Sequence, residues 1–95
     1  MRTDFDVLHN HHEAPVFRAV RERAAAEPEG WTAETLQDVA CVALNRLPAR
    51  YIRHDADFYF FLTDEERRRQ DQAVADAVAY AFDFVAARRA LRPPG

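Results

Sequence analysis

The fold is decided by residues 32–53, which read TAETLQDVACVALNRLPARYIR. In the first part of this stretch apolar side chains recur every three or four positions, which places them on one face of an α-helix. These side chains are Leu36, Val39, Ala40, Ala43, Leu44 and Leu47. Because proline inside a helix removes a backbone donor, we expect a helix that begins at Thr32 and ends at Pro48.

The stretch after Pro48 is rich in aromatic residues and predicts a small β-hairpin. Residues 50–53 read RYIR, residues 58–62 read FYFFL, and the polar residues HDAD lie between them at 54–57. Aromatic and β-branched runs on either side of a polar turn are typical of paired strands. We therefore expect two short strands joined by a turn at 54–57.

Upstream, the spacing predicts a first helix from Asp4 to about Glu27, with Asp4 or Asp6 as its cap. The residues at helical spacing are Phe5, Leu8, His12, Val16, Val20 and Ala24. Pro15 falls inside this run, so we expect it to kink or split the helix. The sequence EPEG at 27–30 ends the helix in a turn, and we expect Trp31 to pack back on the core.

Downstream, Thr63 and Glu66 have the spacing of a capping box, in which each side chain bonds the other's backbone amide. A third helix therefore begins here and runs to about Leu91, before Pro93 and Pro94. It carries two adjacent apolar stripes: Val74, Val78, Ala81, Phe82 and Val85, then Ala73, Ala77, Tyr80, Phe84 and Leu91. Two helices and a small sheet would not cover an arc this wide, so we expect part of it to meet a second chain.

Together these elements predict a mainly α fold of three principal helices, with a short β-hairpin between the second and third helices, assembled as a homodimer. A chain of 95 residues is too short to divide its core in two. We therefore expect residues 1–95 to form one domain.

Composition excludes several classes of protein. The formal net charge of −3 argues against general nucleic-acid binding, which needs a strongly basic face. No apolar run approaches the roughly 18 residues of a membrane span, and the N-terminal sequence MRTDFDVLHN lacks the hydrophobic region of a signal peptide. We therefore expect a cytoplasmic protein that does not contact membranes.

No pattern in the sequence predicts catalysis, a metal or a cofactor. Ser-His-Asp, P-loop and GxGxxG arrangements are absent. His9, His11 and His12 with Glu13 are the most metal-like cluster, but their order is not HExxH and few other ligands are near, so we expect solvated or core-edge histidines. Cys41, the single cysteine, is expected to be a buried structural thiol rather than a nucleophile. We therefore expect that the protein is not an enzyme.

One segment does suggest a binding site. A helix that ends at Pro48 and turns into a strand brings together three guanidinium groups, an amide and an aromatic ring, from Asn45, Arg46, Arg50, Tyr51 and Arg53. Arginine clamps phosphate bidentately, and arginine planes or tyrosine rings stack on purines. The alternative is structural: Arg50 and Arg53 would pair with Asp38, Asp55 or Asp57, and Tyr51 would belong to the core.

The same segment resembles a known family. Residues 38–51, DVACVALNRLPARY, are similar to the pattern of the late-competence ComFB family, in which Asp and small apolar residues precede ALN-x-LP-x-RY. Upstream, Asn10, Glu13 and Val16 resemble that family's N-x-x-E-x-x-V on the first helix. The resemblance covers about residues 5–90.

The resemblance implies a cytoplasmic, dimeric, mostly helical bacterial regulator not known for catalysis. Members of the family are linked to competence and type IV pili, and some are receptors for cyclic di-nucleotides, notably cyclic di-GMP. Many carry a zinc-binding cysteine cluster between the first two helices, but residues 27–35 here contain no cysteine, so zinc is not carried over. We expect a cyclic di-nucleotide receptor that signals through a regulatory partner; the alternative is an adaptor or structural dimer in competence or pilus regulation without a small ligand.

Overall fold

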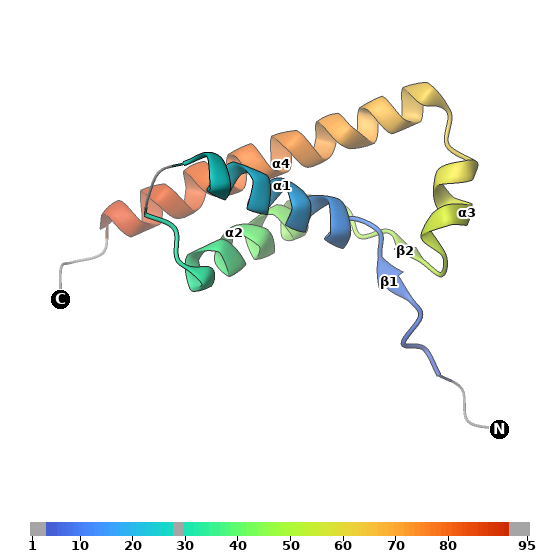
Figure 1. Cartoon of the computed structure of the whole chain (residues 1–95), viewed down its shortest axis with the longest axis horizontal. Coiled ribbons are helices and arrows are strands. Elements are labelled where there is room, and N and C mark those ends of the chain that lie inside the picture. Colours follow the sequence, from blue (N-terminus) through green and yellow to red (C-terminus); the bar gives the residue numbers. More distant parts are fainter. Residues whose placement is uncertain (1–3, 28–29, 92–95) are drawn as a thin grey trace.

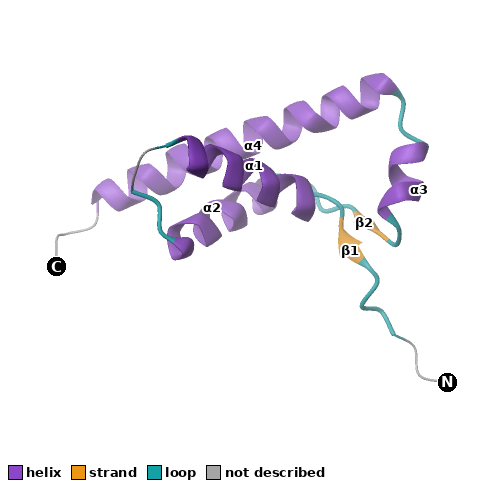
Figure 2. Cartoon of the chain, viewed as in Figure 1, coloured by secondary structure: helices purple, strands orange, loops and turns teal. Residues whose placement is uncertain are grey.

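The computed structural model describes residues 4–27 and 30–91, which are mainly helical (Figure 1). In chain order the elements are β1 (His9–Asn10), α1 (Glu13–Ala26), α2 (Ala33–Arg46), β2 (Tyr51–Ile52), α3 (Asp55–Phe60) and α4 (Asp64–Leu91). The helix α4 is the longest, and α1 and α2 lie along its C-terminal part, whereas α3 lies near its N-terminal end (Figure 2). The two short strands lie between these groups.

The core forms where α1, α2 and α4 meet. Its buried side chains are Val16, Val20, Val39, Ala43, Leu47, Val74, Ala77, Val78, Ala81, Phe82 and Val85. Phe82 is the largest, 1% exposed, and burying such a ring stabilises the fold by about 1.5–3 kcal/mol. Trp31 packs edge-on against it, with ring centroids 4.9 Å apart, which confirms that Trp31 returns to the core.

The predicted second and third helices are confirmed, and so is the capping box that begins the third. Thr32 precedes α2, and its hydroxyl accepts a hydrogen bond from the Thr35 amide at 3.2 Å. At the start of α4 the Thr63 hydroxyl accepts from the Glu66 amide at 3.1 Å, and the Glu66 carboxylate accepts from the Thr63 amide at 3.2 Å. Such caps satisfy amides that have no partner within the helix. Pro93 and Pro94, the predicted stop, lie outside the described residues, as do Pro28 and Glu29 of the predicted turn.

The prediction of a first helix from Asp4, kinked at Pro15, is wrong. The helix α1 begins at Glu13, because residues 9–10 pair with β2 instead of continuing it upstream. Pro15 thus falls in the first turn, where amides lack intrahelical acceptors and a missing N–H costs nothing. Upstream, Phe5 is 67% exposed and does not join the core.

The prediction of a hairpin between residues 50–53 and 58–62 is also wrong. Tyr51 and Ile52 pair antiparallel with Asn10 and His9, and the whole of α1 and α2 lies between the two strands in the sequence. Most of the expected second strand instead belongs to helix α3. Asp55 and Asp57 lie in the first turn of this helix, where their negative charges interact favourably with the helix dipole. Its Phe58 ring packs on His11, with centroids 4.1 Å apart. The Tyr59 carbonyl accepts a hydrogen bond from the Arg67 guanidinium of α4 at 3.0 Å.

The two predicted stripes of α4 differ in burial. All members of the first stripe are buried. In the second stripe Ala77 is buried, whereas Ala73, Tyr80, Phe84 and Leu91 are exposed. Tyr80 and Phe84 stack on each other with centroids 5.9 Å apart. This exposed row of α4 is the surface that we predicted to contact a second chain.

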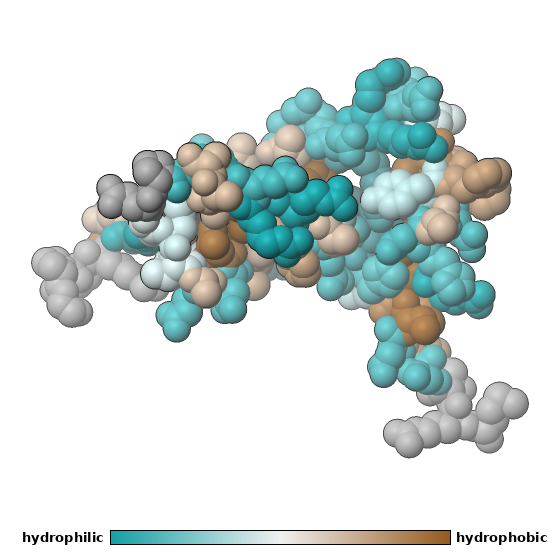
Figure 3. All heavy atoms as spheres, in the orientation of Figure 1, coloured by the Kyte–Doolittle hydropathy of each residue, from teal (hydrophilic) through white to brown (hydrophobic). Residues whose placement is uncertain are grey.

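A second exposed apolar region surrounds α3 and the segment leading into β1. Phe60 and Phe61 are each 78% exposed, and Val7 and Leu8 are also exposed. Figure 3 shows hydrophobic surface at this end of the molecule, whereas the part over α1 is largely hydrophilic. Within residues 4–27 and 30–91, no helix combines the length and apolar character needed to span a bilayer.

Candidate functional site

Asn10 joins the chain before α1 to the segment after α2. Its side-chain carbonyl accepts hydrogen bonds from the backbone amides of Arg50, at 3.0 Å, and His12, at 3.3 Å. The Glu13 carboxylate accepts from the Asn10 amide at 3.1 Å, and the His11 amide donates to the Arg50 carbonyl at 2.7 Å. Both backbone groups of Arg50 are therefore fixed by the β1 end of the chain.

Arg50 lines an open pocket of about 340 Å³, which we call the Arg50 pocket. Its walls come from the residue before α1, the segment between α2 and β2, and α4; the residues are His12, Leu47, Pro48, Ala49, Arg50, Arg69, Gln70 and Ala73. The Arg50 guanidinium carbon lies 4.5 Å from the centroid of the Phe58 ring of α3. This cation–π contact orients the side chain without neutralising its charge.

The other predicted site residues do not line this pocket. The Arg46 guanidinium, in the last turn of α2, lies 3.7 Å above the Tyr80 ring of α4. Asn45 and Arg53 are exposed, and Tyr51 in β2 is 71% exposed. The structure therefore leaves all five residues accessible near the α2–β2 junction, but it turns Arg46 toward α4 and Arg50 toward α3.

The structural alternative, in which Arg50 and Arg53 form ion pairs with Asp38, Asp55 or Asp57, is not found among the described residues. Within the described residues no carboxylate lies within ion-pairing distance of Arg46, Arg50 or Arg53. Asp55, one of the expected partners, instead contacts the His9 ring at 2.8 Å. The exposure of Tyr51 likewise excludes a role in the core of this chain.

The three neighbouring histidines occupy different environments. The hydrogen bond to Asp55 raises the pKa of His9, and the Val7 carbonyl acts in the same direction. Burial lowers the pKa of His11, although its Nε2 contacts the Gln70 side-chain oxygen at 3.0 Å. Burial also lowers the pKa of His12, against the opposing effect of the Pro48 carbonyl. Burial therefore favours the neutral form of both rings.

The residues that build this junction coincide with a family pattern. The family model of the late competence development protein ComFB matches residues 9–89, which include both strands and nearly all of α4. The chain belongs to the ComFB family. No curated protein and no solved structure is significantly similar to it.

The ComFB motif N-x-x-E has a structural role in this chain. Asn10 fixes the backbone of Arg50, and Glu13 holds the Asn10 amide at the start of α1. The motif was visible in the sequence, but its partner was not, because Asn10 and Arg50 are 40 positions apart. Asn10 thus fixes the backbone from which the Arg50 side chain projects.

Four residues that line the Arg50 pocket lie outside the segment 45–53 in which the site was predicted, namely His12, Arg69, Gln70 and Ala73. Arg69 lies in a run of three arginines at 67–69, each of which could be a solvated surface residue. Its place in the pocket depends on how α4 crosses the end of α2, and no local pattern encodes that crossing. His12 was assigned to a helix face, although it precedes α1.

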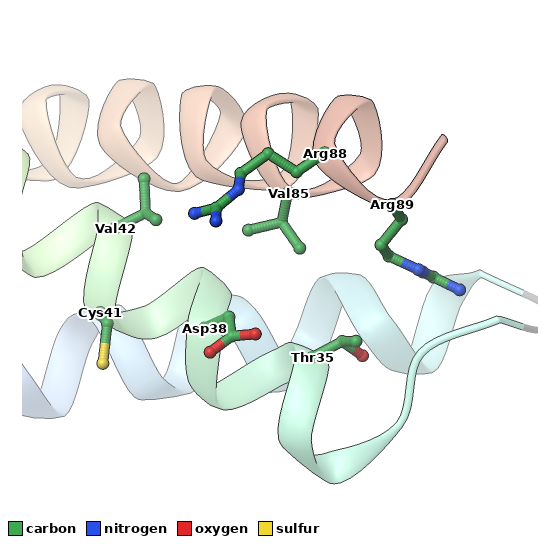
Figure 4. Close-up of a pocket in the computed structure, with 7 residues that line it drawn as sticks. All are labelled: Thr35, Asp38, Cys41, Val42, Val85, Arg88 and Arg89. Atoms are coloured by element: carbon green, nitrogen blue, oxygen red, sulfur yellow. The ribbon is translucent and has the colours of Figure 1, made fainter. Parts of the chain in front are cut away.

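The prediction that Cys41 is buried is wrong: its thiol is exposed on α2. A helix turns about 100° per residue, so Cys41 lies nearly opposite Val39, which is buried. Cys41 borders a second hollow of about 290 Å³ between α2 and α4, together with Thr35, Asp38, Val42, Val85, Arg88 and Arg89. In Figure 4 its sulfur points away from α4, whereas Arg88 reaches toward α2.

The histidine cluster does not assemble a metal site with other ligands. Within the part of the chain that the structure describes, no group of three His, Cys, Asp or Glu side chains is placed to hold a metal ion. His9 is engaged by Asp55 and His11 by Gln70. The expectation of a metal-free protein remains a prediction, for which elemental analysis of untagged protein is the test.

Proposed function

We propose that this ComFB protein is a non-catalytic receptor for a cyclic di-nucleotide, with cyclic di-GMP as the leading ligand, and that it acts as a homodimer in bacterial regulation. Family membership supports a regulatory role. The observation that carries the proposal is Arg50, which lines a pocket and whose guanidinium has no carboxylate partner among the described residues. Leaving a cation unpaired beside a pocket favours an anionic ligand.

The chemistry around Arg50 suits a phosphate that carries a base. Arginine offers a planar fork that matches phosphate oxygens, and Arg46 and Arg53 add two more cations near the same junction. Tyr51 is an exposed aromatic ring on which a purine could stack. Asn45 supplies an exposed amide at the rim.

The proposed dimer is argued from the exposed row of α4. Tyr80 and Phe84 are 39% and 38% exposed, and their rings stack along the helix. Aromatic rings in a row on a helix face are typical of interface anchors. A cyclic di-nucleotide is roughly two-fold symmetric, and a two-fold dimer presents two copies of each arginine to it.

The alternative function is an adaptor or structural dimer in competence or type IV pilus regulation, without a small ligand. The exposed aromatic end, formed by Phe60 and Phe61 between α3 and α4, favours this alternative because both rings are 78% exposed. Exposed apolar patches of this kind mark protein interaction sites. The two functions are compatible if the same aromatic end meets the downstream partner of a receptor.

Calorimetric titration of the purified protein with cyclic di-GMP, cyclic di-AMP and linear GTP tests the proposal. The receptor function predicts saturable binding of at least one cyclic di-nucleotide and much weaker binding of GTP. Absence of heat and of any shift in the thermal melt with both cyclic ligands would assign the adaptor function instead. The melt serves as an independent readout, because a ligand that binds only the folded state raises its stability.

A further inference from the structure

The Arg50 pocket has cations on two of its walls. Arg50 comes from the segment before β2, and Arg69 comes from α4. No carboxylate lines the pocket in the described part of the chain. Arg69 does approach Glu65 at 3.9 Å, but both side chains are more than 70% exposed. Such pairs are worth little, so Arg69 is free to turn toward a ligand.

The rest of the pocket lining is largely apolar. Leu47, Pro48 and Ala49 come from the segment after α2, and Ala73 comes from α4. His12 and Gln70 supply polar groups, and His12 is 7% exposed with an Nδ1 atom that has no hydrogen-bond partner among the described residues. An apolar lining with a few polar groups suits a nucleobase, and the two arginines of the lining suit its phosphate.

The volume limits what the pocket can hold. At about 340 Å³ it lies near the lower end of the range of ligand pockets, which runs from roughly 300 to 1,000 Å³. It therefore fits one nucleotide unit better than a whole cyclic di-nucleotide. The second half of such a ligand would remain outside this chain's pocket.

We propose that the Arg50 pocket binds a single nucleotide unit, with Arg50 and Arg69 both contacting its phosphate and the Leu47–Ala49 side with Ala73 packing on its base. The proposal deepens the proposed function and rests on it for the identity of the complete ligand. It adds a ligand contact from α4 that the sequence motif around Arg50 does not contain. It also predicts that a mononucleotide competes for the site.

The test uses the full chain and two probes, cyclic di-GMP and GMP. Arg69→Gln removes the charge of the second cation, and Arg68→Gln is the matched control, because Arg68 is its exposed neighbour outside the pocket lining. Ala73→Leu fills the pocket without changing charge. We expect Arg69→Gln to weaken cyclic di-GMP binding about tenfold or more, Ala73→Leu to weaken it similarly, and Arg68→Gln to change it little. GMP should displace the cyclic ligand.

Folding controls keep these results interpretable. Arg69 is exposed, so thermal melts of Arg69→Gln and Arg68→Gln should match the parent. Ala73 belongs to the exposed row of α4, which is the proposed dimer surface. Sedimentation should therefore confirm that Ala73→Leu keeps the assembly state of the parent. If it does not, the two arginine variants decide the question by themselves.

The outcomes separate this inference from the proposed function. If cyclic di-GMP binds and Arg69→Gln binds it as tightly as Arg68→Gln, the pocket assignment is overturned while the receptor function stands. A third outcome is that GMP binds the parent and binds Arg69→Gln more weakly, while neither cyclic di-GMP nor cyclic di-AMP binds. The pocket assignment is then supported and the receptor function fails. If no nucleotide binds, both fail.

Discussion

The Asn10 side-chain carbonyl accepts a hydrogen bond from the Arg50 backbone amide at 3.0 Å, across 40 positions of sequence. The same oxygen accepts from the His12 amide at 3.3 Å. One side chain thus ties the start of α1 to the segment that presents Arg50. The backbone of the candidate ligand contact is therefore set by a residue that does not line the pocket.

Asn10→Ala should lower the free energy of unfolding by about 1–2 kcal/mol, because it leaves two backbone amides without their acceptor. Urea denaturation of both proteins measures the change. Asn45→Ala is the matched control, since Asn45 is exposed on α2 and should tolerate the change with little effect. Equal stability of the two variants would mean that solvent replaces the Asn10 contacts at no cost.

Stability should fall on mild acidification because of His11 and His12. Burial lowers the pKa of both rings, so below the unfolded-state value of about 6.5 the unfolded chain binds more protons and is favoured. Urea midpoints measured from about pH 7.5 to 5.5 should therefore decrease. His11→Phe keeps a ring against Phe58 but cannot be protonated, so its midpoint should depend less on pH.

His9 should oppose this trend. The Asp55 contact raises its pKa, so its stabilising contribution is fully present below about pH 6.5 and is lost as pH rises through the folded-state value. The pair is exposed and its contribution is small. His9→Gln should accordingly make the acid loss slightly steeper, and a shallower profile in this variant would contradict the assignment.

The parts of the fold that local sequence determines were predictable, and the parts that depend on distant contacts were not. The caps at Thr32 and Thr63 involve residues three positions apart, so their sequences reveal them. The pairing of Asn10 with Tyr51 connects segments on either side of two helices, and no local pattern encodes it.

The same distinction explains the errors around α3 and the candidate site. An aromatic run such as 58–62 has strand propensity, yet Phe58 is held in a short helix by His11 and Arg50. Arg50 was identified from its motif, whereas Arg69 enters the pocket only through the crossing of α4. Cys41 differs, because its distance from the buried stripe of α2 was already evident from helical spacing.

Phe84→Asp should dissociate the proposed dimer, because an unpaired carboxylate is costly to bury. Sedimentation of the parent at micromolar concentration should give about twice the chain mass of 11.0 kDa, and the variant should give the monomer. Phe61→Asp is the matched control: Phe61 is 78% exposed and lies outside α4. A parent that sediments as a monomer would remove the role given to Tyr80 and Phe84.

Arg50→Ala should weaken cyclic di-nucleotide binding about tenfold to a hundredfold, because a charge-assisted contact is worth roughly 1.5–3 kcal/mol. The melt should change little, since Arg50 has no carboxylate partner in the described residues and loses only its contact with Phe58. Arg50→Lys should recover part of the affinity, because lysine keeps the charge but lacks the fork. Calorimetry and thermal melts of the three proteins provide the measurement.

The opposite pattern would reassign Arg50. Its backbone bonds to Asn10 and His11 survive substitution, so a large loss of stability in Arg50→Ala must come from the side chain over Phe58. If that variant unfolds while any folded remainder binds the ligand as tightly as the parent, the guanidinium holds α3 in place and does not contact the ligand. The adaptor function, with the exposed aromatic end near α3 as its contact surface, would then be favoured, because Arg50 would serve to position that end.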